Sequence, residues 1–101
     1  MAERLDLHTL LKETAGTNNV YFQPPETLKM LYPCIVYKRD FAKTIFAENL
    51  PYKYDKRYMV IVIDLNPDSD IPDKISALPM CIFDRHYTAD KLNHDVFKLF
   101  F

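Results

Sequence analysis

The side chains best suited to chemistry gather near the C-terminal end of the chain, within positions 84 to 95. They are carboxylates, imidazoles, a guanidinium and an amide, namely Asp84, Arg85, His86, Asp90, Asn93, His94 and Asp95. Imidazoles and carboxylates ligate metals and transfer protons, and the other groups donate directional hydrogen bonds. Apolar runs at 80–83 and 96–101 flank this stretch and predict a strand, a polar turn and a closing strand. Such residues can build an enzyme site, a metal site or a network that fixes a protein interface.

The two histidines are the starting point for a metal site or an acid–base site. Zinc takes three or four converging ligands, and His86 and His94 would converge only if the chain turns back near 89–91. The sequence has no CxxC or HExxH pattern to support a metal. A histidine–aspartate pair would also lack an evident nucleophile, because the local hydroxyls are those of Tyr87 and Thr88. We therefore predict no catalytic residue, no metal site and no cofactor.

A structural role for the polar stretch fits the rest of the chain better. Side chains at 84–85 and 93–95 can hydrogen-bond across a hairpin, and Arg85 can fork onto a carboxylate at a subunit contact. Seven tyrosines and seven phenylalanines in 101 residues are more than one small core needs, and tyrosine suits a wet interface. We predict a network that holds the fold or an interface, made of Asp84, Arg85, His86, Asn93, His94 and Asp95.

A second acidic stretch resembles the opening of an EF-hand calcium loop. Oxygen-bearing side chains occupy alternate positions, at Asp64, Asn66, Asp68 and Asp70. The sixth position, which should be glycine, is Ser69, and the twelfth, which should be a bidentate glutamate, is Ile75. We expect this segment to be a solvated turn that caps the following helix.

Composition narrows the class of protein. The 101 residues are predicted to form one domain, 1–101, and the hydrophobic fraction of 49% is enough for a packed core. Thirteen basic residues against 14 acidic ones leave no field of one sign, which disfavours nucleic acid as a main partner. No apolar run approaches the roughly 20 residues that span a bilayer, so we expect a soluble protein without a membrane partner.

Glycine and cysteine add two further limits. Gly16 is the single glycine, which excludes Gly-rich phosphate loops and argues against type I′ hairpin turns. Cys34 and Cys81 lie inside apolar runs, as expected of reduced core thiols in a reducing cytoplasm.

Periodicity predicts the order helix, three or four strands, helix, two strands. The helices are expected at 6–14 and 71–78, and strands at 20–22, 32–37 and 59–63 before the two at the C-terminal end. Residues 38–40 are expected to be a polar connector to a weak segment at 41–46, and 49–51 a turn. The run 59–63 is apolar on both faces, so we expect a central strand covered on both sides or buried by a neighbouring subunit. The fold class is therefore α+β, with a mostly antiparallel mixed sheet of four to five strands flanked by two helices.

A series of short motifs runs through nearly the whole chain, from about Leu5 to Phe101. They are Tyr21-Phe22-Gln23-Pro24-Pro25, Tyr32-Pro33-Cys34-Ile35-Val36-Tyr37, Arg57-Tyr58, Val62-Ile63-Asp64, Pro67-Asp68-Ser69, Phe83-Asp84-Arg85-His86 and Leu92-Asn93-His94-Asp95. In this order and spacing the chain resembles a family of small structural proteins of tailed bacteriophages, the tail-terminator (tail-completion, neck) proteins.

The resemblance implies a fold and a role. Tail terminators have a mixed sheet flanked by helices, and they assemble as a ring of about six copies on the last ring of the tail tube. The ring ends tube polymerisation and docks to the connector, or head-completion protein, and DNA passes through its lumen without specific binding. The implied location is the neck of the virion, after assembly in the host cytoplasm. Another neck or tail assembly protein, such as a head-closure protein, is the alternative, ahead of a small metal-dependent enzyme.

Overall fold

The residues that the structure describes fold as a five-stranded mixed sheet with two helices. The computed structural model describes residues 4–101, and for 43, 45–47 and 51–54 it describes the backbone alone. The elements are α1 (Arg4–Ala15), β1 (Val20–Phe22), β2 (Cys34–Ala47), β3 (Leu50–Asp64), α2 (Ile71–Ser76), β4 (Cys81–Ala89) and β5 (Leu92–Phe100). This arrangement confirms the predicted α+β class, including the mixed sheet and the two helices.

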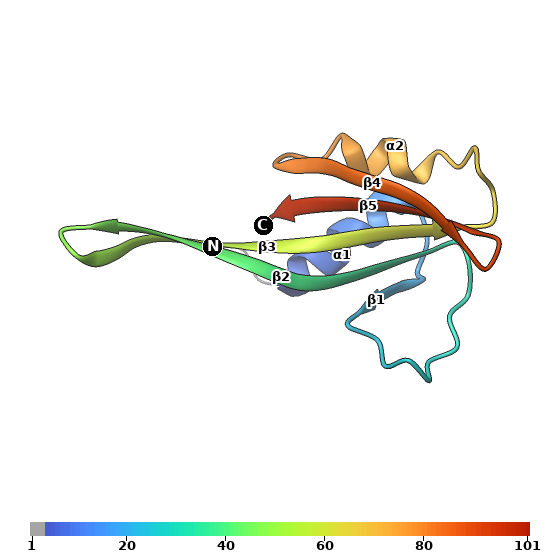
Figure 1. Ribbon diagram of the computed structural model, residues 1–101, viewed down its shortest axis with the longest axis horizontal. Helices are drawn as coiled ribbons and strands as arrows, with labels where there is room; N and C mark the ends of the chain where they lie inside the picture. Colours follow the sequence, from blue (N-terminus) through green and yellow to red (C-terminus); the bar gives the residue numbers. More distant parts are fainter. Residues whose placement is uncertain (1–3) are drawn as a thin grey trace.

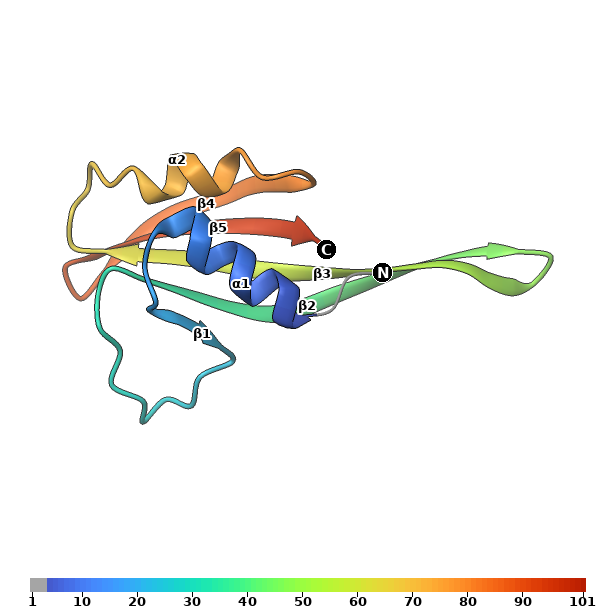
Figure 2. The same cartoon turned by 180° about the vertical axis from the view of Figure 1, so that it is seen from behind.

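The sheet order is β1-β2-β3-β5-β4, so β3 is central and β1 and β4 are the edges (Figure 1). Only β1 and β2 pair in parallel, and the other neighbours are antiparallel. Both helices lie against the same face of the sheet (Figure 2). We call the other face, which neither of the two described helices covers, the open face. The expectation of a central strand at 59–63 is confirmed, but its cover by helices is on one side.

The core lies between the helices and the covered face. Alternate residues of each central strand enter it, and they meet apolar side chains one turn apart on each helix, such as Leu7 and Leu11 of α1 and Ile71 and Ile75 of α2. Gly16 ends α1 as predicted, with a φ of +71° and an N–H that donates to the Lys12 carbonyl at 2.9 Å. The C-terminal helix is shorter than predicted, ending at Ser76.

The largest departure from prediction is the length of the β2–β3 hairpin. Residues 38–40 are not a connector, because β2 continues through them to Ala47 and β3 begins at Leu50. Pairing of β3 with β5 begins only at Arg57, so the two strands run on alone beyond the sheet (Figure 1). We call this two-stranded part, Phe41 to Lys56, the arm. The phenylalanine and tyrosine side chains at 46, 52 and 54, counted above among the surplus aromatics, lie outside the described residues.

Both antiparallel hairpins turn without glycine. Glu48 and Asn49 have φ of 53° and 63°, and Asp90 and Lys91 have φ of 51° and 64°. Positive φ at both central residues is the pattern of a type I′ turn, so the argument from glycine content against such turns was wrong. Asn and Asp tolerate this conformation, and its twist matches that of long paired strands, which offsets the strain at Glu48 and Lys91.

Candidate functional site

The six predicted network residues lie on the β4–β5 hairpin, but on two faces of the sheet. His86 pairs with Asp95, and the His86 Nδ1 lies 2.8 Å from an Asp95 carboxylate oxygen. The next pair, Tyr87 and His94, stacks its rings with centroids 4.5 Å apart. Adjacent cross-strand pairs point to opposite faces. The two histidines therefore lie on opposite sides of the sheet and cannot share one metal ion.

The remaining three residues make separate contacts. Arg85 donates to its neighbour Asp84 at 2.6 Å, where an irregularity in β4 places both residues opposite Val96. Asn93 donates from its amide nitrogen to the Asp64 carbonyl at 3.3 Å, which ties β5 to the end of β3. The structure thus brings together His86 and Asp95, and leaves the six residues as several small contacts instead of one network.

Other candidate ligands are also in structural roles. In the acidic loop, Asp64 accepts from the Asn66 N–H, and Asn66 from the Asp68 N–H, both at 3.0 Å. Among residues 4–101, no group of three or more His, Cys, Asp or Glu side chains is placed to hold a metal. Cys34 and Cys81 are free thiols, as predicted. Burial, followed by the nearby Asp64 charge, raises the pKa of Cys34 to about 11, so this thiol is unreactive at neutral pH.

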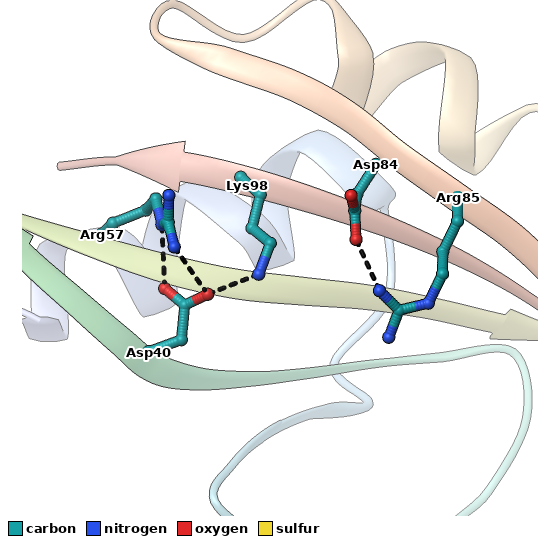
Figure 3. Close-up of polar contacts among 5 residues, drawn as sticks. All are labelled: Asp40, Arg57, Asp84, Arg85 and Lys98. Carbon is teal, nitrogen blue, oxygen red and sulfur yellow. Dashed lines mark hydrogen bonds and ion pairs between the residues drawn. The ribbon is translucent and has the colours of Figure 1, made fainter.

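A polar cluster that sequence reasoning missed lies on the open face at the root of the arm. Asp40 forms a β-bulge in β2, the extra residue between Arg39 and Phe41. Its carboxylate accepts from the Arg57 Nε at 3.2 Å and from the Lys98 Nζ at 2.5 Å. In Figure 3 the Lys98 side chain extends from β5 toward β3, where it meets the Asp40 carboxylate of β2. We call Asp40, Arg57 and Lys98 the Asp40 cluster.

The Asp40 carboxylate is partly shielded from water, and the two cations beside it favour its ionised form. The Asp40 side chain is only 13% exposed. Burial by itself would raise the pKa of Asp40, but the hydrogen bonds and charges of Lys98 and Arg57 outweigh it and lower that pKa. The Arg57 guanidinium also lies 4.7 Å from the centre of the Phe41 ring, a cation–π contact. The cluster therefore joins three strands where the arm leaves the sheet.

The cluster had a weak signal in the sequence. Residues 38–40 interrupt two apolar, β-prone runs. Charged residues inside a strand pattern mark either a connector or a bulge, and the sequence pattern alone does not separate the two. The partner Lys98 is 58 positions away, so only the folded sheet brings it to Asp40.

A second missed cluster fixes α1 to the sheet. The buried Tyr37 hydroxyl oxygen lies 2.7 Å from the His8 Nδ1 and accepts from Arg4 at 3.2 Å. The tautomer of the His8 ring decides which of the two groups, the Tyr37 hydroxyl or the His8 Nδ1, donates in their shared hydrogen bond. Burial, then the charges of Lys12 and Arg4, lower the pKa of His8, which keeps its ring neutral.

The edge strand β4 is exposed along most of its length. Residues 82–89 are all exposed, and large apolar side chains project from both faces, with Ile82 66% exposed on the open face and Phe83 52% exposed on the covered face. A hollow of about 530 Å³ lies toward the other edge of the open face, lined by Gln23, Pro24, Val36, Lys38, Arg39 and Ile61. Apolar side chains on both faces of an edge strand suit a strand that becomes interior in a complex.

Within residues 4–101, the structure contains no helix with the length and apolar character needed to cross a bilayer. Comparison of the sequence with models of protein families and with curated proteins finds no match. The likeness to tail terminators therefore stays a prediction that rests on the motifs given above.

Proposed function

We propose that this protein is a structural component of a tailed-phage virion that caps the tail tube as a ring. In this role the ring ends tube polymerisation and docks to the head connector. About six copies close by rotation, as a heterologous contact requires, and DNA passes through the lumen without specific binding. The protein assembles in the host cytoplasm and stays at the virion neck.

The observation that carries this proposal is the arm. A two-stranded ribbon is marginally stable in water by itself, yet β2 and β3 are 14 and 15 residues long and outrun every other strand. The Asp40 cluster fixes the ribbon at its root, so the arm projects in a defined direction. A projecting ribbon that its own fold leaves unpaired is suited to contact with another protein, and the sequence motifs point to the tail-terminator family.

The exposed edge strand supports the same conclusion from the other side of the sheet. A ring subunit needs two different adhesive surfaces, one for each neighbour. The outer strand of the arm, β2, lies next to the edge strand β1, and β4 is the edge strand at the other end of the sheet (Figure 1). The arm and β4 can therefore contact two different neighbours.

Deletion of the gene from its phage tests the proposal. Negative-stain electron microscopy of the lysate should show overlong or unattached tails beside filled heads. Expression of the wild-type protein from a plasmid should restore joined virions of normal tail length. Normal joined virions without the gene would overturn the proposal, and normal-length tails that fail to join heads would move the protein to another neck position.

A further inference from the structure

We propose that neighbouring copies join by β-sheet pairing, in which the outer edge of the arm of one copy adds to the edge strand β4 of the next. The inference rests on the proposed ring and names the surfaces that close it. It would make one continuous sheet around the ring, with order β1-β2-β3-β5-β4 followed by β2 of the next copy.

The outer edge of β4 carries backbone groups that β5 does not bond. Phe100 donates to the Met80 carbonyl, so this cross-strand pair is hydrogen-bonded. Hydrogen-bonded and non-bonded pairs alternate along an antiparallel ladder, and the irregularity at Asp84 inserts one residue. The N–H groups of Phe83, His86 and Thr88 therefore point away from β5, at the open edge. This row of unpaired donors and acceptors is a template for another strand.

The arm also has a backbone edge without a neighbouring strand in the described fold. The short strand β1 pairs with β2 only at Ile35 to Tyr37, so the outer edge of β2 from Asp40 to Ala47 has no neighbouring strand in the described fold. This edge is about as long as β4, which has nine residues. The Arg39 N–H donates to the Gln23 side chain and therefore points to the outer edge of β2. Outward and inward N–H groups alternate along the strand, and the bulge at Asp40 inserts one residue. The N–H groups of Ala42 and Thr44 therefore also point to the outer edge.

The directions of the strands allow the two edges to pair. Along the sheet β2, β3, β5 and β4 alternate in direction, so β4 runs opposite to β2. A copy related by rotation about a ring axis presents its β2 antiparallel to β4, which is the more stable pairing. The arm begins where β5 ends, so it lies farther along the strand direction than β4. Pairing of the two shifts neighbouring copies by roughly 25 Å along the strands. A closed sheet with such a shift has strands that tilt relative to the ring axis.

The exposed side chains fit this arrangement. Ile82 and Phe83 project from opposite faces of β4, and Phe41 at the start of the arm is 48% exposed. If the arm of a neighbouring copy paired with β4, its side chains would contact these exposed side chains on each face of the sheet.

Paired cysteine substitutions test the contact in the assembled particle. Thr44→Cys and Thr88→Cys, in one chain, replace exposed residues on the two proposed edges. Each single variant is the matched control, and the native thiols are buried or half-buried with raised pKa values. The variants would complement the gene deletion, and purified virions would be treated with a mild oxidant and run on a non-reducing gel.

The double variant should give a ladder from dimers up to closed rings, and each single variant should stay mainly monomeric. Dimers from Thr88→Cys alone would overturn the inference, because two β4 edges would then pair about a two-fold axis. Protein that enters virions without cross-linking in the double variant would overturn the edge contact while leaving the ring proposal in place. Protein absent from virions would overturn the proposed function together with the inference.

A second pair of variants tests the edge without cysteine chemistry. Ile82→Lys places a charge on the β4 edge, and Leu65→Lys places one on an equally exposed side chain in the 65–70 loop, at 66% and 64% exposure. Ile82→Lys should lower plaque yield at least tenfold while the purified protein unfolds at the same urea concentration as wild type. Equal yields of the two variants would count against β4 as a contact.

Discussion

Asp40 and Asp84 occupy matching irregularities in two hairpins of one sheet, and each bonds a basic side chain on the open face (Figure 3). Asp40 is 13% exposed and receives cations from two other strands, β3 and β5. Asp84 is 33% exposed and receives only its sequence neighbour Arg85. The Asp40 carboxylate connects strands that are far apart in the sequence, whereas the Asp84 carboxylate bonds the next residue in the chain.

This difference shows where the fold fixes its strands and where it leaves them available. The root of the arm is held by charge-assisted hydrogen bonds across three strands, and the C-terminal Phe101 N–H adds a bond to the Lys56 carbonyl at 3.1 Å. Among the described residues, the polar side chains of β4 contact their neighbours in β4 or in β5, within one hairpin. The root of the arm is therefore held by contacts between distant parts of the chain, whereas β4 is held through its own hairpin.

Removing the Asp40 carboxylate should have the largest effect. Asp40→Asn should lower the free energy of unfolding by about 2 kcal/mol, because it leaves two cations facing a neutral amide at a partly buried position. Asp84→Asn should change it by less than about 0.5 kcal/mol, since its pair is exposed and local. Urea unfolding followed by circular dichroism measures both. Equal losses would remove the distinction between the two irregularities.

The Asp40 cluster also predicts a dependence on pH. The folded-state pKa of Asp40 lies below its ordinary 3.8, so the unfolded chain binds the proton more readily. The stability that the cluster contributes is therefore complete above the unfolded pKa and is lost as pH falls through the folded pKa. Urea midpoints measured between pH 5 and pH 2 should fall less in Asp40→Asn than in wild type. Parallel curves for the two proteins would contradict this origin of the acid sensitivity.

A separate loss of stability should occur nearer neutral pH because of His8. Its folded-state pKa lies below the ordinary 6.5, so protons favour the unfolded chain as pH falls through 6.5. His8→Gln should flatten this part of the curve while leaving the Asp40 part unchanged. A pH curve that is the same in wild type and His8→Gln would show that burial of the ring does not depress its protonation.

The two hairpin turns offer a smaller contrast. Lys91 has a positive φ that costs a lysine side chain about 1 kcal/mol, so Lys91→Gly should stabilise the protein by about 0.5–1 kcal/mol. Asn49 already tolerates its positive φ, so Asn49→Gly should change stability by only a few tenths of a kcal/mol. Thermal unfolding of the two variants measures this. A destabilised Lys91→Gly would mean that the lysine side chain makes a contact that outweighs the strain.

A small effect is also expected at the pair that sequence reasoning singled out. His86→Ala should cost less than about 0.5 kcal/mol, because the His86–Asp95 bond is made at the exposed edge of the sheet. A loss above 1 kcal/mol, measured by urea unfolding, would mean that the His86–Asp95 pair contributes substantially to the stability of the fold.

The sequence predicted the elements whose signals are local. The helix ended by Gly16, the strand at 20–22 and the C-terminal hairpin all depend on residues within a few positions of one another. Asp40 could not be predicted in the same way, because its partners come from two distant strands and its own irregularity resembles a connector in the sequence. The polar stretch at 84–95 was easy to find but hard to interpret, since alternation along β4 and β5 sends its side chains to opposite faces.

The central claim is that the protein assembles through backbone edges that its own fold leaves unpaired. Amide hydrogen exchange, compared between the dilute purified protein and intact virions, tests it most directly. The outward N–H groups of Phe83, Thr88 and Thr44 should exchange rapidly in the dilute protein and become protected at least a hundredfold in virions. Central β3 amides, such as that of Val60, should be protected in both. Rapid exchange of the edge amides in virions would contradict the claim.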